Sequence, residues 1–368
     1  MKSYRLEFDG LKPALDIPSD GSPVIIAGPC GAESREQVVE TAEALAGAGI
    51  NVFRCGLWKP RTMPGCFEGV GEAGLPWLVE AGKRTGMLTA TEVATPAHLR
   101  AALDAWIDIL WIGARTTVNP FLVQEIADEA SIYVANGRDV RFLVKNPVNP
   151  DVDLWIGAIQ RLYNAGVRRI SAVHRGFSAY GAKSYRNPPQ WPVPVELGRR
   201  IKGIQILCDP SHIGGKRELV EPLAKEALRM GFDGLIIESH RDPDAALSDA
   251  RQQLTPAALS AVLGRLRKTP ASNTSDSGND SAELSALREQ IDRVDDSLME
   301  LLSQRMGIAR AIGELKERNN MPVLQPKRYD SLITGRVNNA EALGLSPDFV
   351  RKLLGVIHEE SLRQQLHK

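Results

Sequence analysis

Short apolar runs rich in Val, Ile and Leu alternate regularly with longer amphipathic segments through residues 20–265. Continuous apolar runs of this length are typical of parallel strands buried on both faces, and the segments between them repeat apolar residues at helical spacing. We expect eight strands, at residues 23–30, 50–59, 87–93, 109–114, 140–147, 168–176, 205–212 and 234–240. Eight strand–helix units in about 250 residues predict an α/β fold, a (β/α)8 TIM barrel.

A doubly wound open sheet is the alternative arrangement of alternating strands and helices. Its first strand–helix turn normally carries a Gly-rich nucleotide loop. The corresponding turn here reads GPCGAES, which is a poor match to GxGxxG. The barrel is therefore the favoured fold, and residues 1–20 are expected to form a strand or hairpin ahead of it.

The pattern changes after residue 268. Residues 269–280, TPASNTSDSGND, contain no large apolar side chain and predict a flexible linker. Residues 281–320 then carry apolar residues at heptad-like spacing, which predicts one amphipathic helix of roughly 35 residues, followed by two shorter helices. We therefore divide the chain into a barrel at 1–268, a linker at 269–280 and an all-α domain at 281–368. A helix this long must bury its apolar stripe against a partner, which favours an intertwined homodimer.

Composition excludes several classes of function. The chain is 43% hydrophobic and has 45 basic and 45 acidic residues, which gives no support to nucleic-acid binding. No apolar run approaches the ~20 residues needed to cross a bilayer, and the first residues lack the apolar core of a signal peptide. Four cysteines without close pairing are typical of a reducing compartment. These features predict a cytoplasmic protein that binds neither nucleic acid nor membrane.

Three side chains between residues 205 and 250 are suitable ligands for a divalent metal: His212, Glu238 and Asp249, the last expected on a helix after the final strand. Cys30, at the end of the first strand, is a candidate fourth ligand. Imidazole, carboxylate and thiolate ligands of this kind suit Mn, Fe or Zn. Alternatively, His212 and Glu238 cap strand ends and Cys30 is a small buried hydrophobe. Spacing alone does not decide between the two interpretations.

Charged side chains gather where the expected strands end, which is where a (β/α)8 barrel places its functional groups. The strand-end residues, in chain order, are Cys30, Arg54, Lys59, Arg61, Thr62, Glu92, Arg115, Lys145, His174, Arg175, Asp209, His212 and Glu238. Solvated surface charge would instead be scattered over the helices. So many cations at one mouth fit a substrate with two phosphates, or with a phosphate and a carboxylate, whose carbonyl a metal would polarise.

The motifs AGPC, FRCGLWKPRT, GART, KNP, DPSH and IIESH…ALSDA resemble those of 3-deoxy-D-arabino-heptulosonate 7-phosphate (DAHP) synthases of the smaller microbial subtype, over residues 20–265. The resemblance implies condensation of phosphoenolpyruvate with erythrose 4-phosphate, the first step of the shikimate pathway. It also implies one metal ion, with Mn favoured over Fe, Zn or Co, held by Cys30, His212, Glu238 and Asp249. The substrate-binding residues that it implies are Arg54, Lys59, Arg61, Thr62, Glu92, Arg115, Lys145 and Arg175.

Within that set, Arg61 and Thr62 of KPRT are expected to bind the aldose phosphate and the other cations phosphoenolpyruvate. Lys59 is the expected proton donor to the developing alkoxide, with a pKa lowered by the surrounding cations. A sister family with the same barrel makes 3-deoxy-D-manno-octulosonate 8-phosphate from arabinose 5-phosphate, and it is the alternative. KPRT favours the four-carbon aldose. No role is assigned to His174.

The C-terminal residues resemble the all-helical chorismate mutases, over essentially all of 281–368. The matching residues are Arg288, Arg305, Lys316, Gln325, Arg328, Ser361 and Gln365. The resemblance implies rearrangement of chorismate to prephenate, with Arg288 supplied by the other protomer and with Lys316 and Gln365 donating to the ether oxygen. Gln325 stands where an acidic residue is common in the family.

Three interpretations of the helical segment remain open. It is an active mutase, a dimerisation and sensor module that binds prephenate or chorismate without turnover, or an unrelated interaction domain. The matching cations disfavour the third. Because prephenate lies downstream of DAHP, we also predict that prephenate inhibits the synthase through this domain.

Overall fold

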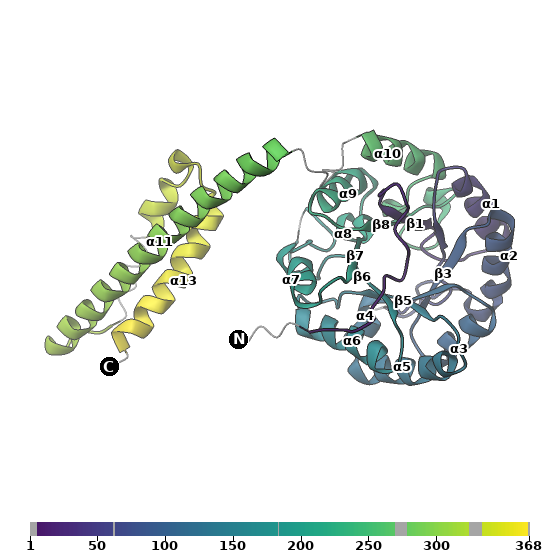
Figure 1. Ribbon diagram of the computed structural model, residues 1–368, viewed down its shortest axis with the longest axis horizontal. Helices are drawn as coiled ribbons and strands as arrows, with labels where there is room; N and C mark the ends of the chain where they lie inside the picture. Colours follow the sequence, from purple (N-terminus) through teal and green to yellow (C-terminus); the bar gives the residue numbers. More distant parts are fainter. Residues whose placement is uncertain (1–5, 62, 183, 269–277, 324–332, 367–368) are drawn as a thin grey trace. The chain divides into compact units, whose positions relative to one another are not determined.

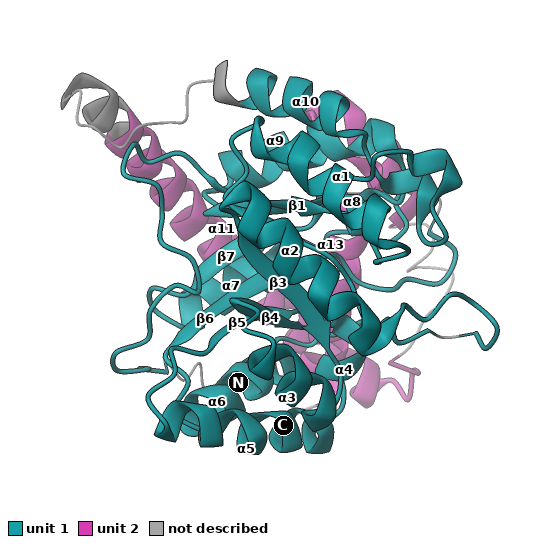
Figure 2. Cartoon of the chain, turned by 90° about the vertical axis from the view of Figure 1, so that its right-hand side faces the viewer, with its two compact units in different colours: residues 1–273 teal, residues 274–368 magenta. Residues whose placement is uncertain are grey.

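A computed structural model describes residues 6–61, 63–182, 184–268, 278–323 and 333–366. The chain forms two compact units, Met1–Asn273 and Thr274–Lys368, which are coloured separately in Figure 2. Of the expected linker at 269–280, residues 269–277 lie outside the described part, whereas 278–280 already belong to the long helix of the second unit. Within the described residues, no helix is both long and apolar enough to span a membrane.

The first unit is a closed barrel of eight parallel strands in sequential order, β1 to β8, which confirms the expected fold (Figure 1). Strands are β1 Val24–Gly28, β2 Val52–Arg54, β3 Leu88–Val93, β4 Ile109–Ile112, β5 Arg141–Lys145, β6 Arg169–His174, β7 Gln205–Cys208 and β8 Gly234–Glu238. All eight were expected, but seven of them end two or more residues earlier than predicted. Their last predicted residues instead begin the loops that carry the site.

Helices surround the barrel, with short 3-10 helices (η) in several loops. In the first unit they are α1 Arg35–Ala46, η1 Gly71–Gly74, α2 Leu75–Thr85, α3 Pro96–Asp104, α4 Ala114–Thr117, α5 Pro120–Ala135, α6 Val152–Asn164, α7 Pro192–Arg200, α8 Pro210–Gly214, η2 Arg217–Leu219, α9 Val220–Arg229, η3 Pro243–Ala245, η4 Ala250–Gln252 and α10 Pro256–Lys268. Their apolar faces and the outward-facing strand residues form the larger core.

The N-terminal segment closes one end of the barrel. Among residues 6–20 the expected strand or hairpin is absent, and only isolated bridges form, from Leu6 to Ile201 and from Lys12 to Arg169. Ala14 is buried inside the barrel, where its backbone N–H donates to Ser171 Oγ at 2.9 Å. This contact lies near the N-terminal ends of the strands, so the opposite mouth is left for the functional site.

The second unit is helical, as expected. Helix α11, Gly278–Arg318, packs against α13, Pro347–Leu366, and the short η5, Glu341–Leu343, precedes α13. Residues 333–338 are also helical. Helix α11 is 41 residues long, which corresponds to about 60 Å. Its apolar residues at roughly 3.5-residue spacing are exposed in the single chain, namely Leu287, Ile291, Val294, Leu298, Leu301 and Ile308.

Candidate active sites

The four predicted metal ligands come together at the C-terminal mouth of the barrel. Strands β1 and β8 are neighbours, and this places Cys30 beside Glu238. Ligand atoms of Cys30, Glu238 and Asp249 all lie within 4.8 Å of one another. His212 Nε2 lies 3.7 Å from Glu238 Oε1 and 3.9 Å from Asp249 Oδ2. A thiol, an imidazole and two carboxylates facing one point are a donor set that suits a divalent transition metal.

His212 is oriented by its own helix. Asp209 caps the N-terminus of α8, accepting the His212 backbone N–H at 3.0 Å, and its Oδ2 lies 2.8 Å from His212 Nδ1. The same carboxylate oxygen accepts from Lys145 Nζ at 2.8 Å. Metal-binding histidines characteristically place one ring nitrogen against a carboxylate in this way, which directs the other nitrogen at the metal.

The position of Asp249 corrects the sequence prediction. It was expected on the helix after β8, but it lies between the short helices η3 and η4, with a left-handed backbone at φ 52° and ψ 32°. A residue other than Gly in this region carries a conformational cost, and such residues cluster at functional sites. The left-handed residue turns the chain back over the mouth, so that the carboxylate reaches Cys30 Sγ at 3.2 Å.

Cys30 is completely buried, and burial, reinforced by the nearby carboxylate of Glu238, raises the pKa of its thiol. Its Sγ lies 2.7 Å from Lys59 Nζ, and its backbone carbonyl accepts from both Lys59 and Arg54. A bound divalent cation favours the thiolate form of a cysteine ligand. The residues present therefore fit a metal ion.

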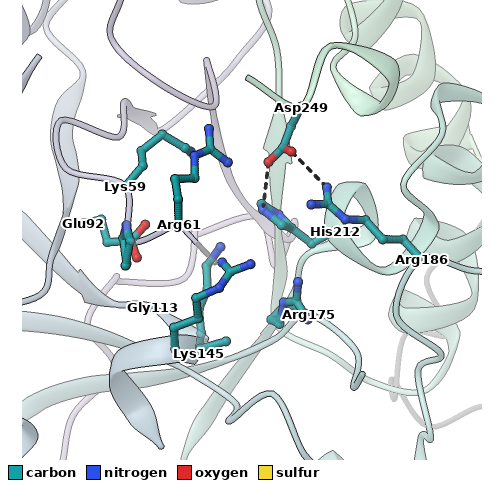
Figure 3. A pocket seen from close by; sticks show the side chains of 12 residues that line it. Lys59, Arg61, Glu92, Gly113, Lys145, Arg175, Arg186, His212 and Asp249 are labelled. Carbon is teal, nitrogen blue, oxygen red and sulfur yellow. Dashed lines mark hydrogen bonds and ion pairs between the residues drawn. The ribbon is translucent and has the colours of Figure 1, made fainter. Parts of the chain in front are cut away.

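A cationic pocket opens beside these ligands (Figure 3). The predicted residues that line it are Lys59, Arg61, Glu92, Arg115, Lys145, Arg175, His212 and Asp249. The Glu92 carboxylate packs against Gly113 of the GART motif, since a Cβ there would lie 2.0 Å from Glu92 Oε1. Burial lowers the pKa of Arg175 to about 10, so its guanidinium remains charged at neutral pH.

Two predicted substrate-binding residues are not placed in this lining. Thr62 lies outside the described residues. Arg54 is buried, donates to Glu238 Oε1 at 3.2 Å, and has its guanidinium carbon 4.7 Å from the centre of the Trp111 ring. Lys145 Nζ lies 5.8 Å from the same ring centre. Trp111 thus contacts the two cations from the barrel interior.

The expectation that neighbouring cations lower the pKa of Lys59 is wrong. Burial does lower it, but the Cys30 sulfur and the Glu238 carboxylate outweigh burial and the Arg54 charge, and the pKa of Lys59 ends above its usual value. Anionic groups, not only cations, surround this amine. Lys59 is therefore protonated at neutral pH.

His174 is separated from the pocket chemistry. Its ring packs among Phe177, Trp191 and Phe232, with ring centres 5.5, 5.2 and 6.2 Å away. Burial, with a further contribution from Arg175, lowers its pKa to about 3, so the imidazole is neutral. Val173 packs in the barrel interior and Arg175 lines the pocket. His174, between them, packs in the aromatic layer outside the sheet.

Sequence reasoning missed Arg186 and Gln252. Arg186 lines the pocket and donates to Asp249 Oδ1 at 3.1 Å and to Gln252 Oε1 at 2.7 Å. Gln252 in turn donates to Glu238 Oε2 at 2.7 Å. The sequence could have indicated Arg186 by its position in the long connection after β6, because such loops carry functional residues in barrels.

In the helical unit, α11 and α13 bring together two predicted pairs. Arg305 donates to Ser361 Oγ, and Lys316 Nζ donates to Gln365 Oε1 at 3.0 Å. The helices approach closely here, because a Cβ on Gly313 would lie 2.9 Å from the Gln365 Cα.

Arg288 is exposed and 17 residues before Arg305 on the same helix, which corresponds to about 25 Å along its axis. It therefore cannot reach the cluster formed by Arg305, Lys316, Ser361 and Gln365 of its own chain. Gln325 and Arg328 lie outside the described residues.

Comparisons with known proteins assign each unit. Residues 14–270 match the DAHP synthetase I family, and residues 287–366 match chorismate mutase type II. The phospho-2-dehydro-3-deoxyheptonate aldolase of Thermotoga maritima is 34% identical over 261 residues, which cover 69% of this chain and 74% of that protein. Its crystal structure superposes with a TM-score of 0.60 at 33% identity, covering 68% of this chain and 69% of that one.

Two further relatives bear on the alternatives. The 2-dehydro-3-deoxyphosphooctonate aldolase of Nitratidesulfovibrio vulgaris is 28% identical over 264 residues, covering 66% of this chain and 90% of that protein. The T-protein of Enterobacter agglomerans is 40% identical over 87 residues, which cover 24% of this chain and only 23% of that protein. The DAHP synthetase I family model covers about 70% of the chain, and the residues that it matches form the closed barrel. This match decides the family. The chain belongs to the DAHP synthetase I family and carries a chorismate mutase type II domain at its C-terminal end.

Proposed function

We propose that Cys30, His212, Glu238 and Asp249 bind one divalent metal ion, Mn in preference to Fe, Zn or Co, beside the cationic pocket that receives both barrel substrates. The chain is bifunctional: its barrel condenses phosphoenolpyruvate with erythrose 4-phosphate and water to DAHP and phosphate, and its helical domain rearranges chorismate to prephenate. The convergence of the four ligand side chains supports the metal site most strongly.

The charged residues of the pocket are assigned to different parts of the two substrates. Arg115, Lys145 and Arg175, together with the buried Arg54, neutralise the phosphate and carboxylate of phosphoenolpyruvate. Arg61 and Thr62 bind the aldose phosphate. The metal supplies Lewis-acid polarisation of the aldehyde when it is bound. Lys59, protonated and beside Cys30, donates a proton to the oxygen that becomes an alkoxide as carbon 3 of phosphoenolpyruvate attacks.

In the mutase domain, Arg305 and Ser361 bind a carboxylate of chorismate, and Lys316 and Gln365 donate to the ether oxygen that gains charge in the rearrangement. Gln325 and Arg328 complete this site as proposed from the sequence. No nucleophile is required, because the protein holds the reactive conformer and stabilises the developing charge.

The exposed apolar stripe of α11 is covered by a second copy of the chain, which also supplies Arg288. We expect Arg288→Ala and Arg305→Ala each to lower mutase kcat by about 10²–10³-fold, as loss of a charge-stabilising donor does. Refolding the two variants together should restore up to about a quarter of wild-type activity. About half of the dimers formed at random are mixed, and each mixed dimer has one intact site of two.

A mixture that stays inactive would mean that Arg288 and Arg305 of each site come from the same chain, and would contradict the shared site. Arg363→Ala, an exposed arginine of α13 paired with Glu359, is the control and should retain activity.

Prephenate is the proposed inhibitor of the barrel, acting through the helical domain in the cytoplasm, where the free cysteines would stay reduced. The test follows phosphoenolpyruvate consumption by full-length protein with erythrose 4-phosphate or arabinose 5-phosphate, with and without prephenate. We expect turnover of the four-carbon aldose, suppressed by prephenate, and no suppression in a chain truncated after residue 269.

The aldose comparison, the prephenate addition and the truncation each test a different part of the proposal. Preference for arabinose 5-phosphate would assign the barrel to the sister reaction. Equal inhibition of the truncated chain would exclude the helical domain as the sensor, and turnover indifferent to prephenate would leave dimerisation as the reason for the fusion.

A further inference from the structure

The segment that carries Arg186 is fixed to the helix that carries His212. The backbone N–H of Arg186 donates to Gly214 O at 3.3 Å, and the backbone N–H of Asn187 to Ile213 O at 3.1 Å. The Asn187 side-chain amide donates to the His212 carbonyl at 2.7 Å. Three hydrogen bonds thus hold the loop after β6 against α8, so the base of the Arg186 side chain has a defined position next to a metal ligand.

The guanidinium of Arg186 then reaches the loop after β8, which carries Asp249 and Gln252. Its Nη1 donates to Asp249 Oδ1 at 3.1 Å and to Gln252 Oε1 at 2.7 Å. Gln252 is buried, and its Nε2 donates onward to Glu238 Oε2 at 2.7 Å. One cation therefore contacts one carboxylate directly and the second through a buried amide.

The oxygens held in this way are those that face away from the other ligands. Asp249 Oδ2, the oxygen that Arg186 does not contact, accepts from Cys30 Sγ at 3.2 Å, and Glu238 Oε1 lies 3.7 Å from His212 Nε2. Glu238 Oε1 also accepts from Arg54 at 3.2 Å. Each carboxylate thus has one oxygen bound to Arg186 or Gln252 and one directed toward the cluster.

We propose that Arg186 and Gln252 are positioning residues that restrict Asp249 and Glu238 to one ligating oxygen each. With Cys30 and His212 this gives four protein donors and leaves coordination positions open for substrate or water, as a catalytic metal requires. The inference rests on the metal site proposed above. Arg186 acts through the carboxylates, although its side chain also faces the pocket.

The test measures Mn(II) affinity of the full-length protein by competition with a fluorescent chelator, which does not depend on activity. Replacing a group that orients a ligand typically weakens metal binding 10–100-fold, and we expect Arg186→Met to raise the Mn(II) Kd by about that factor. Gln252→Leu should raise it as well. Arg186→Lys keeps the positive charge but ends one bond short of the Nη1 position that makes both contacts, and should give an intermediate value.

Arg217→Met is the matched control. Arg217 contacts the same loop, through the carbonyls of Ala250 and Gln253 and the carboxylate of Asp244, but no ligand carboxylate. Its Mn(II) Kd should equal that of the wild type. Equal loss of affinity in Arg217→Met would attribute the effect to loop stability and overturn the proposal.

Two other results would also be decisive. Wild-type Mn(II) affinity in Arg186→Met with a raised KM for the aldose phosphate would make Arg186 a substrate-binding residue and refute the positioning role. Failure of the wild type itself to bind Mn(II), Fe(II), Zn(II) or Co(II) would refute the metal site and the positioning role with it. The two failures are thus distinguished by the wild-type titration.

Discussion

Protein stripped of divalent metal by a chelator is expected to lose phosphoenolpyruvate consumption by about 10³-fold, equivalent to about 4 kcal/mol of transition-state stabilisation, and to regain it with Mn(II). A divalent cation held by the proposed ligands Cys30, His212, Glu238 and Asp249 would polarise the aldehyde, and the chelator removes this contribution. His212→Ala should reproduce the loss without recovery on adding metal. Steady-state assays before and after metal addition measure both effects.

The mutase reaction provides an internal control in the same sample. The site proposed for it includes Arg305, Lys316, Ser361 and Gln365, and the possible metal ligands that cluster among the described residues, Cys30, Glu238 and Asp249, belong to the barrel. Chorismate consumption should therefore be unchanged by the chelator and by His212→Ala. Loss of both activities together would indicate unfolding, and full synthase activity in the chelated protein would contradict a catalytic metal.

Replacement of Lys59 by Met is expected to lower kcat for phosphoenolpyruvate condensation by about 10²–10⁴-fold, the range typical of a general acid. Lys59 is protonated, lines the pocket and lies 2.7 Å from Cys30 Sγ, so its proton is available beside the metal position. Methionine keeps the unbranched apolar part of the side chain and removes the donor. The comparison of kcat with Mn(II) affinity separates proton donation from an effect on the metal.

Lys216→Met is the control for this substitution. Lys216 follows α8 but does not line the cationic pocket, so its replacement should leave kcat within a factor of about two, as for most surface substitutions. Retention of most of the rate in Lys59→Met would exclude Lys59 as the proton donor. A fall in rate matched by loss of Mn(II) would assign Lys59 to the integrity of the metal site instead.

The barrel was predictable because each strand is an uninterrupted apolar run between segments of helical periodicity. Once the strands were known, the convergence of Cys30, His212 and Glu238 followed, since the C-terminal ends of barrel strands meet at one mouth. Strand lengths were overestimated because the predicted strands were extended through motifs such as VHRG and CDPSH, whose last residues belong to the site loops. Hydrophobic periodicity in the sequence does not show where the backbone hydrogen bonds between neighbouring strands end.

Features set by loops were not predictable in the same way. The left-handed backbone of Asp249 and the contacts of Arg186 depend on how three loops meet, which no local pattern encodes. The raised pKa of Lys59 depends on the Cys30 sulfur and the Glu238 carboxylate, which are distant in sequence. The neutral state of His174 depends on burial in an aromatic layer assembled from separate elements. Each of these features depends on tertiary contacts, which a local sequence pattern does not specify.

X-ray absorption spectroscopy of Mn(II)-loaded full-length protein is a direct test of the proposed metal ligands. We expect one Mn per chain, with one sulfur scatterer from Cys30, one imidazole from His212 and the remaining ligands oxygen. Cys30→Ala should lose the sulfur scatterer, and His212→Ala should lose the imidazole signal. An environment of oxygen alone in the wild type would contradict the proposed ligand set.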